Sequence, residues 1–556
     1  MPTWTKKGIQ TMPERHYAAN LVVIGGGLGG VAAALTAARL GSTVVLAERG
    51  DWLGGQLTTQ AVPPDEHKWI ETHQISPSYS ELRNRIRDHY RRNYPLTDAA
   101  KNTINLNPGE GFVSGLCHEP RVGALAILEM VSPLIASGLL KVLTHVEPLA
   151  VEREGSRLVA VLVRDSRDGR ETRLEGRFVA DATELGDLLP LADVPFVMGA
   201  ESADETGERH APAVADPLDQ QAVTWCAALE YRAGEDHTID RPAGYDHWKT
   251  SVAPFWPGPQ LSWDDVEPIT LGRRTRPIFA GGPHDAETSR DHDLWHYRRI
   301  LARATMRPSW PSGDVTLMNW PQADYWEKPL LGVGDAARQS ALDGARELTL
   351  SFIHWMQTEA PRSDGGTGYP ELLLRGDVTG TGDGLAKEVY VRESRRIRAL
   401  FTITEGHIGR HMREDDRSAA QFSDSVGVGY YRIDLHPSTS GRTYIDIDCH
   451  PFQIPLGALL PQGVDNLLAA NKNIGTTHIT NGAYRLHPVE WSIGEAVGAL
   501  AAFCAEERVS PEQVYRTEGV LRDFQALLNG RLGIMLAWPD EIRTSDRHLA
   551  SIRVAR

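Results

Sequence analysis

The apolar positions near the N-terminus predict a strand, a tight turn, a helix and a second strand. A short apolar run at 21–24 precedes a glycine-rich turn, and an alanine-rich stretch continues to Leu40. The next apolar run, from Thr43 to Ala47, is followed by an acidic residue. This order of elements is typical of a Rossmann-like unit, in which two parallel strands flank a helix.

The glycines of this turn have the spacing G-x-G-x-x-G, at Gly25, Gly27 and Gly30. The first permits the tight turn, the second lets the backbone approach a pyrophosphate, and the third lets the helix pack closely on the strand. The helix N-terminus then faces the phosphates. Glu48 ends the second strand, where its carboxylate can accept hydrogen bonds from an adenosine ribose. The sequence therefore predicts a dinucleotide site at this turn.

Later parts of the chain continue the α/β pattern. Alternating apolar residues between 138 and 183 predict a small sheet, followed by a strand at 178–182 that returns to the parallel sheet. A buried strand is expected from Leu467 to Ala470 and, after a polar loop, a helix from about Val489 to Glu506. Small residues such as Gly494 let that helix pack closely.

The region from about 195 to 435 differs from both ends, because it is rich in Trp, Pro and His. Its tryptophans suit a pocket for a molecule with apolar faces, although a core built from large side chains is the commoner explanation. Farther along, Arg395 lies among other charged residues, which form either an ion-pair network or an anion site.

Composition and charge narrow the possible functions. A chain of 556 residues suggests two or three domains. The net charge of -15 and the lack of a basic run interleaved with aromatics argue against nucleic-acid binding. The four cysteines form no C-x-x-C pair, so we expect no metal site, no redox disulfide and a reducing, cytoplasmic setting. Neither a signal peptide nor a membrane-spanning stretch is expected.

Several segments in a fixed order resemble one family of flavoproteins. They include "VVIGGGLGGVAAALTAARLGSTVVLAERGDWLGGQLT", "GRFVADATELGDL", "YVRESRRIRAL" and "VDNLLAANKNIGTTHITNGAYRLHPVEWSIGEAVGALAAF". Together they extend over most of residues 20 to 505. The chain thus resembles the FAD-dependent oxidoreductases of the glutathione-reductase-like class, which have two dinucleotide-binding domains.

The resemblance implies a Rossmann-like FAD-binding domain with a parallel sheet, and an α+β substrate domain. Residues 1–194 are expected to form the first part of the FAD-binding domain, with a helical insertion at 70–105. Residues 195–435 are expected to form the substrate domain, and 436–510 to close the FAD-binding domain. The last residues, 511–556, are predicted to be a C-terminal helical extension.

The resemblance also implies FAD and the residues that contact it. These expected residues are Gly25, Gly27, Gly30, Glu48, Arg49, Gly54, Gly55, Gln56, Ala182, Thr183, Asn473, Gly475, Ser492 and Ile493. In similar flavoproteins the N-terminus of the helix near Ser492 faces the pyrimidine edge of the flavin, where backbone N–H groups stabilise developing negative charge. The sequence departs from the family at Glu184, where many relatives carry glycine after Ala-Thr.

The expected chemistry is dehydrogenation of a small organic molecule at a C–OH or C–N bond, with hydride transfer to flavin N5. A base must remove the heteroatom proton, and the candidates are His478, favoured because it lies in the loop before the flavin-facing helix, and then His436 and His450. Arg485 is a candidate to bind a carboxylate or an oxyanion. The electron acceptor is open, with O2 as one possibility, and the protein could be an oligomer.

Two alternatives stay open. One is a flavin monooxygenase that uses NAD(P)H, although a second nucleotide motif is not visible and a dedicated NAD(P)H domain is therefore not expected. The other is an FAD-binding protein without turnover.

Overall fold

The computed structural model describes residues 3–4, 15–281, 293–414 and 416–544, and its main sheet contains the predicted parallel strands. In spatial order these are β4 (Leu140–Leu143), β3 (Val44–Ala47), β2 (Arg15–Ile24), β7 (Glu171–Asp181) and β22 (Leu467–Ala469). The turn after β2 therefore lies between the ends of β3 and β7. Parallel α/β sheets bind ligands at this carboxyl edge.

An antiparallel meander extends the main sheet on one side. β5 (Val146–Glu154) and β6 (Arg157–Asp165) pair with each other, and β6 pairs with the first half of β7. β1 (Thr3–Trp4) pairs with β5 at the outer edge. The predicted small sheet is thus confirmed, but the expectation was wrong for β4, which lies beside β3 at the opposite edge. The reason is that β4 directly follows a helix and completes a strand–helix–strand crossover.

Two helices with small residues pack on the main sheet. α1 (Leu28–Arg39) and α13 (His487–Glu507) are in close contact along their length. A Cβ atom added at Gly494 would lie only 2.0 Å from the carbonyl oxygen of Gly29. The predicted close packing is therefore confirmed, since any side chain at Gly494 would push the helices apart.

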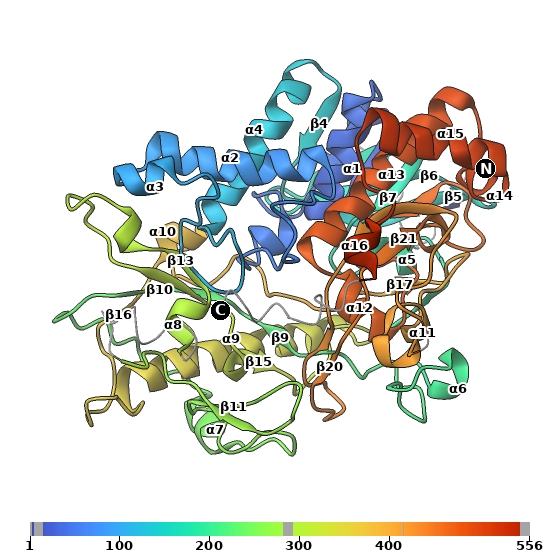
Figure 1. The fold of residues 1–556 in the computed structure, drawn as a ribbon. Coiled ribbons are helices and arrows are strands. Elements are labelled where there is room, and N and C mark those ends of the chain that lie inside the picture. The colour runs from blue at the N-terminus through green and yellow to red at the C-terminus, as the bar shows by residue number, and fades with distance from the viewer. Residues whose placement is uncertain (1–2, 5–14, 282–292, 415, 545–556) are drawn as a thin grey trace.

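The helices of the upper half of the molecule pack together. α2 (Pro77–Asn93) and α4 (Pro120–Ala136) contact each other, and α4 also contacts α1 (Figure 1). α2 and α3 (Asp98–Asn102) lie within the segment predicted to be a helical insertion. The domain boundaries themselves stay predictions.

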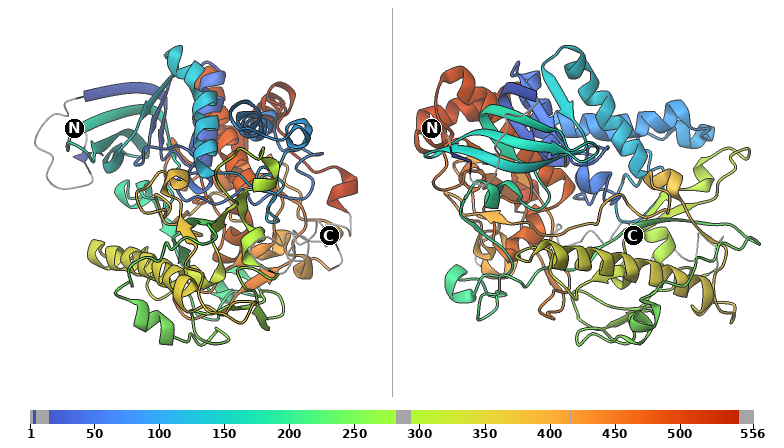
Figure 2. Two further views of the ribbon diagram at one scale, coloured as in Figure 1. Left: turned by 90° about the vertical axis from the view of Figure 1, so that its left-hand side faces the viewer. Right: turned by 180° about the vertical axis from the view of Figure 1, so that it is seen from behind.

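The middle of the chain forms a second, antiparallel part. Its four-stranded sheet has the order β13 (Arg299–Leu301), β14 (Val315–Met318), β10 (Ala227–Tyr231) and β16 (Leu372–Leu374). The long helix α9 (Asp335–Thr358) runs through this part, on the far side from the main sheet (Figure 2). Trp295 and Trp320 are almost fully buried in its core, so the core interpretation is correct for them.

Short elements connect these parts. The strands are β8 (Phe196–Val197), β9 (Val223–Thr224), β11 (Asp264–Val266), β12 (Arg273–Thr275), β15 (Asp324–Tyr325), β17 (Arg396–Ile397), β18 (Ser425–Gly429), β19 (Ile433–Leu435), β20 (Ile445–Ile447) and β21 (Phe452–Pro455). The helices are α5 (Leu188–Leu191), α6 (Ala203–Thr206), α7 (Tyr245–Thr250), α8 (Leu294–Tyr297), α10 (Gly376–Thr379), α11 (Glu405–Ile408), α12 (His478–Tyr484), α14 (Pro511–Arg516), α15 (Glu518–Ala526) and α16 (Asp540–Arg543). Among the helices that the structure describes, none has both the length and the apolar character that a membrane crossing requires.

Candidate functional site

The glycine turn has the geometry expected of a dinucleotide site. Gly25 has a φ of +101°, a left-handed conformation that favours glycine, and a Cβ there would lie 2.2 Å from the carbonyl oxygen of Ala182. A Cβ at Gly30 would lie 2.0 Å from the carbonyl oxygen of Gly25, as expected for close helix–strand packing. Gly54, with a φ of +115°, donates its N–H to Gly26 O at 2.7 Å. The Gly54–Gly55 loop therefore lies directly against the turn.

Glu48 lies at the end of β3, against the same turn. Its Oε2 accepts the Gly26 N–H at 2.5 Å and its Oε1 accepts the Gly50 N–H at 2.7 Å. Burial raises the pKa of Glu48 to about 7, and nearby Glu388 adds to the shift. Glu388 also pairs with Arg49 at 2.5 Å, so Arg49 has a carboxylate partner beside the site.

The ends of β7 and β22 meet at the turn. Asp181 accepts hydrogen bonds from the backbone and the hydroxyl of Thr183, at 3.0 and 2.7 Å. Asn473 donates to Asp181 O at 3.0 Å, and Asn471 donates to Ala182 O at 3.1 Å. The structure thus brings together the 182–183 turn and Asn473, which are far apart in the sequence.

Sequence reasoning missed two charged residues at the turn, Lys472 and Glu490. Lys472 is buried and forms an ion pair with Glu184, the residue that departs from the family pattern. Glu490 accepts the Gly29 N–H at 3.2 Å, in the first turn of α1, and also a hydrogen bond from Gln56. Burial raises the pKa of Glu490 to about 7, and Lys472 opposes the shift. Glu490 lies on the helix predicted to face the flavin, and this position is the sequence signal that could have identified it.

Other predicted cofactor contacts lie in different surroundings. Gly475 is packed against the Ala399 side chain and donates its N–H to Ala458 O at 2.8 Å. α13 begins at His487, two residues before the expected start, so Ser492 and Ile493 are buried within the helix and not at its N-terminus. A contact between these three residues and a cofactor stays a prediction.

His436 is the half-buried centre of an acid–base cluster, and its partner Asp324 is buried. Its Nδ1 lies 2.5 Å from Oδ2 of Asp324, which also pairs with Arg392 at 3.0 Å. Although burial alone would raise the pKa of Asp324, Arg392 and His436 hold it below its usual value. The other ring nitrogen, Nε2, lies 3.8 Å from Oδ2 of Asp434, too far for a direct hydrogen bond.

Two arginines lie beside this cluster. Arg485 is 3 % exposed and donates to the Tyr390 hydroxyl at 2.7 Å and to Asp434 O at 3.0 Å. Arg298 approaches Asp65 at 3.9 Å. Within the described residues, Nε of Arg485 and both Nε and Nη1 of Arg298 are buried without a hydrogen-bond partner. Buried N–H groups without a partner are costly, so they favour an anionic ligand.

The cluster is linked to the glycine turn by hydrogen bonds. Gln56, which follows the Gly54–Gly55 loop, donates to Arg485 O at 3.0 Å. The Asp65 N–H donates to Nδ1 of His487, the first residue of α13, at 3.1 Å. The arginines and His436 therefore lie next to the elements predicted to contact the flavin.

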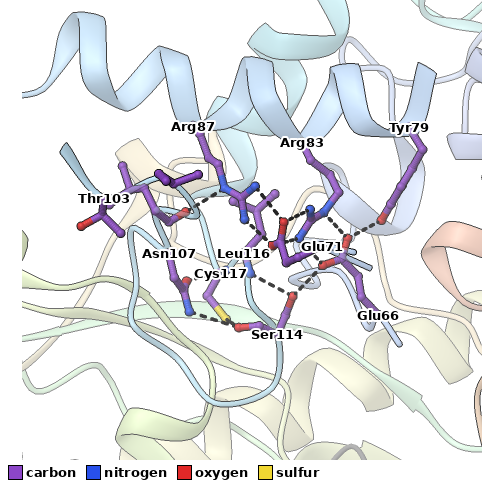
Figure 3. A network of polar contacts seen from close by, with 12 residues as sticks. Glu66, Glu71, Tyr79, Arg83, Arg87, Thr103, Asn107, Ser114, Leu116 and Cys117 are labelled. Carbon is purple, nitrogen blue, oxygen red and sulfur yellow. Dashed lines mark hydrogen bonds and ion pairs between the residues drawn. The ribbon is translucent and has the colours of Figure 1, made fainter. Parts of the chain in front are cut away.

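A network of buried ion pairs fixes the loop that carries Asp65 (Figure 3). Arg83 of α2 binds both oxygens of Glu66, at 2.8 and 3.1 Å, and both oxygens of Glu71. Arg87 adds a bond to Glu71 at 2.5 Å. Although burial alone would raise it, these arginines hold the pKa of Glu71 at about 2. Helix α2 thus anchors the loop beside the cluster.

His478 and His450 have different surroundings from those of His436. Nδ1 of His478 lies 2.9 Å from Glu393, and Nε2 accepts a hydrogen bond from Arg442 at 2.8 Å. Because an arginine only donates, Nε2 of His478 is already used as an acceptor. His450 lines a separate cavity of about 720 Å³, together with His210 and His411. Arg395 pairs with Asp187 at 3.2 Å.

Comparison with known proteins identifies the family. The family described as "FAD dependent oxidoreductase" matches residues 20–528. No curated protein matches the chain.

The chain is also similar to solved structures at low sequence identity and low TM-score, three of which follow. The myxobacterial halogenase CndH is 13% identical, with a TM-score of 0.33, over 93% of this chain and 81% of that chain. The geranylgeranyl bacteriochlorophyll reductase-like protein of Thermoplasma acidophilum is 10% identical, with a TM-score of 0.30, over 93% of this chain and 84% of that chain. The L-proline dehydrogenase from P. horikoshii is 18% identical, with a TM-score of 0.17, over 34% of this chain and 24% of that chain.

The residues at the turn fit a dinucleotide with hydroxyl groups and phosphates. Buried Oε1 atoms of Gln56 and Glu184 have no hydrogen-bond partner among the described residues, and hydroxyl groups of ribose and ribityl can donate to them. The N-terminus of α1 already donates a hydrogen bond to a carboxyl oxygen, that of Glu490. From the family match and this geometry, the chain belongs to the FAD-dependent oxidoreductase family, and its cofactor is FAD.

Proposed function

We propose that this enzyme dehydrogenates a small organic acid at a C–OH or C–N bond next to its carboxylate. The bound FAD supplies a hydride acceptor at flavin N5. The observation that carries the proposal is the pairing of half-buried His436 with buried Asp324. Beside it lie two arginines with N–H groups that have no hydrogen-bond partner among the described residues. We also propose that the protein is located in the cytoplasm, because all four cysteines are buried and none forms a disulfide.

His436 is proposed to be the base, in place of His478. Asp324 accepts a hydrogen bond from the Nδ1–H group and so fixes the tautomer with a lone pair on Nε2. Nε2 can then take the proton from a substrate hydroxyl or amine. His478 is less suited because Arg442 already uses its Nε2.

Arg485 and Arg298 are proposed to bind the substrate carboxylate. An arginine matches two carboxylate oxygens with parallel N–H donors, and the binding energy is larger where water is excluded. Tyr390 and Asp434 hold Arg485 in position at 2.7 and 3.0 Å. A held carboxylate orients the adjacent C–H bond toward the cofactor and the heteroatom toward His436.

The experiment compares substrates that differ only in charge. Anaerobic flavin reduction is measured with small 2-hydroxy and 2-amino acids and with the corresponding amides. We expect the acids to reduce the flavin, and Arg485→Met to raise the KM for them by about tenfold or more, in line with the loss of a charge-assisted hydrogen bond. Equal reduction by acids and amides, or reduction by neither, would contradict the proposal.

A further inference from the structure

A cluster of three potential metal ligands lies at the 720 Å³ cavity, away from the His436 cluster. His210 follows α6, Glu405 begins α11, and His411 lies in the 3-10 turn that follows. In Figure 1, α6 and α11 are neighbours at the right-hand side. Hydrogen bonds between His210 and Glu405 join the two segments across almost two hundred residues of sequence.

Both imidazoles converge on one carboxylate oxygen. Nδ1 of His210 lies 2.5 Å from Oε1 of Glu405, and Nε2 of His411 lies 2.6 Å from the same atom. Among the residues that the structure describes, the buried Nε2 of His411 has this ion-pair contact but no hydrogen bond. The two rings are nearly perpendicular, at 88°. Two ring nitrogens are thus directed at one carboxylate oxygen. This arrangement suits a cation held between these three atoms.

The carboxylate is held rigidly from behind. Glu405 is fully buried, and its Oε2 accepts the backbone N–H of His210 at 3.1 Å. The Glu405 N–H in turn donates to Glu208 at 2.8 Å. Such outer contacts orient metal ligands in known sites. A buried carboxylate also needs a positive charge nearby, which a cation supplies.

We propose that His210, Glu405 and His411 bind a divalent transition-metal ion, with Zn²⁺ as the best match to the ligand set. Two imidazole nitrogens and one carboxylate oxygen form a three-ligand zinc site that keeps a fourth position open. Both histidines line the cavity, so the open position faces it. This proposal goes beyond the flavin chemistry and replaces the expectation of no metal.

The ligands need only a small movement to reach coordination distances. Zn–N and Zn–O distances are about 2.0 Å, so ligand atoms in a tetrahedral site are about 3.3 Å apart. The present nitrogen–oxygen contacts of 2.5 and 2.6 Å must therefore open by less than about 1 Å. The side chains of His210 and His411 are 35% and 22% exposed, so they can move outward into the cavity.

The test is metal binding by the full-length, FAD-loaded protein. The protein is stripped with a chelator and then titrated with Zn²⁺, and bound zinc is measured by elemental analysis. Co²⁺ is used in parallel, because tetrahedral Co²⁺ absorbs in the red, where oxidised flavin does not. We expect one ion per chain, and a loss of affinity of more than about a hundredfold in Glu405→Gln and His411→Ala, since even outer-shell changes cost ten- to hundredfold.

A matched control separates this site from an ordinary ion pair. His247 lies 2.7 Å from Glu327, a pair with a single imidazole, so His247→Ala should leave zinc binding unchanged. Flavin absorbance and the unfolding temperature report whether each variant is folded. If Glu405→Gln does not fold, the zinc affinity of His411→Ala is the test, because His411 is partly exposed. No bound zinc in the parent protein, or an equal loss in His247→Ala, would overturn the proposal.

Discussion

Nδ1 of His436 and Oδ2 of Asp324 lie 2.5 Å apart, although 112 residues separate them in the sequence. His436 follows β19 and Asp324 begins β15, so short strands from two different two-stranded sheets create the pair. Charged groups lie on both sides of the pair: buried Arg392 beside Asp324, and partly exposed Asp434 near His436. This is the arrangement of a histidine base held by a carboxylate.

Removing this base should slow flavin reduction without loss of FAD. We expect His436→Gln to lower the anaerobic reduction rate by about 10² to 10⁴, the usual contribution of a general base. Asp324→Asn should lower it as well, since the tautomer is then no longer fixed. The measurement is single-turnover reduction, with FAD content from the absorbance spectrum. His478→Gln is the comparison variant, and a larger loss there than in His436→Gln would contradict the assignment.

Gly25→Ala should abolish FAD binding. The new Cβ would meet the carbonyl of Ala182 at 2.2 Å, in a left-handed backbone conformation. Gly41→Ala is the matched control, because Gly41 also has a positive φ, +92°, but a Cβ there meets no atom within 4 Å. We expect the control to retain FAD with a loss of stability of about 1 kcal/mol. FAD content of the purified variants is the readout, and a yellow Gly25→Ala protein would refute the turn's role.

Arg83→Met should destabilise the protein and disturb the site. Removing one partner of a buried ion pair leaves a buried carboxylate unpaired, which costs about 3–5 kcal/mol. Arg83 is 6% exposed, whereas Arg85, on the same helix and 36% exposed, pairs with Glu81 at the surface. Arg85→Met should cost about 1 kcal/mol or less. Urea-unfolding midpoints compare the two, and equal midpoints would show that the network does not stabilise the loop.

Glu495 should make the protein less stable as the pH rises. Burial raises the pKa of Glu495 from its ordinary value of 4.5 to about 7. A hydrogen bond that Ser78 donates to Glu495 at 2.5 Å opposes this shift. Between these pH values the folded state holds a proton that the unfolded state has released, so stability falls as pH rises through this range and stays lower above it.

Glu495→Gln should remove this dependence. At pH 8 the variant should be more stable than the parent by up to about 3 kcal/mol, and at pH 4 the difference should vanish. Glu506, exposed near the end of the same helix, provides the control Glu506→Gln, whose effect should not change with pH. Thermal unfolding at several pH values gives the answer. An unchanged difference from pH 4 to pH 8 would mean that Glu495 is ionised in the folded state.

The sequence predicts best the parts that local periodicity defines. The strand, turn and helix around Gly25 and the helix α13 are where the apolar pattern places them, because their faces are buried against the main sheet. The register of α13 was less accurate, since Leu486 and His487 give no capping signal from a polar side chain. Strand β4 was assigned to the wrong edge of the main sheet, because a short apolar run does not reveal its partner.

The acid–base cluster could not be predicted in the same way. His436 follows β19, whereas Asp324 and Arg298 come from two separate segments of the middle region. Only tertiary packing brings the three residues together. His478 was favoured from its place in the loop before α13. Its ring contacts Glu393 and Arg442, which lie far from it in the sequence and gave no local signal.

The most direct test of the proposed dehydrogenation is to identify which compound reduces the flavin. FAD-loaded protein is mixed anaerobically with small 2-hydroxy and 2-amino acids, and separately with NADH and NADPH, and the flavin absorbance is followed. We expect at least one acid to bleach the flavin, and this bleaching to be slower in His436→Gln. Neither NADH nor NADPH should reduce the flavin rapidly. Rapid bleaching by NADH or NADPH with no reduction by the acids would contradict the proposed dehydrogenation and favour a monooxygenase.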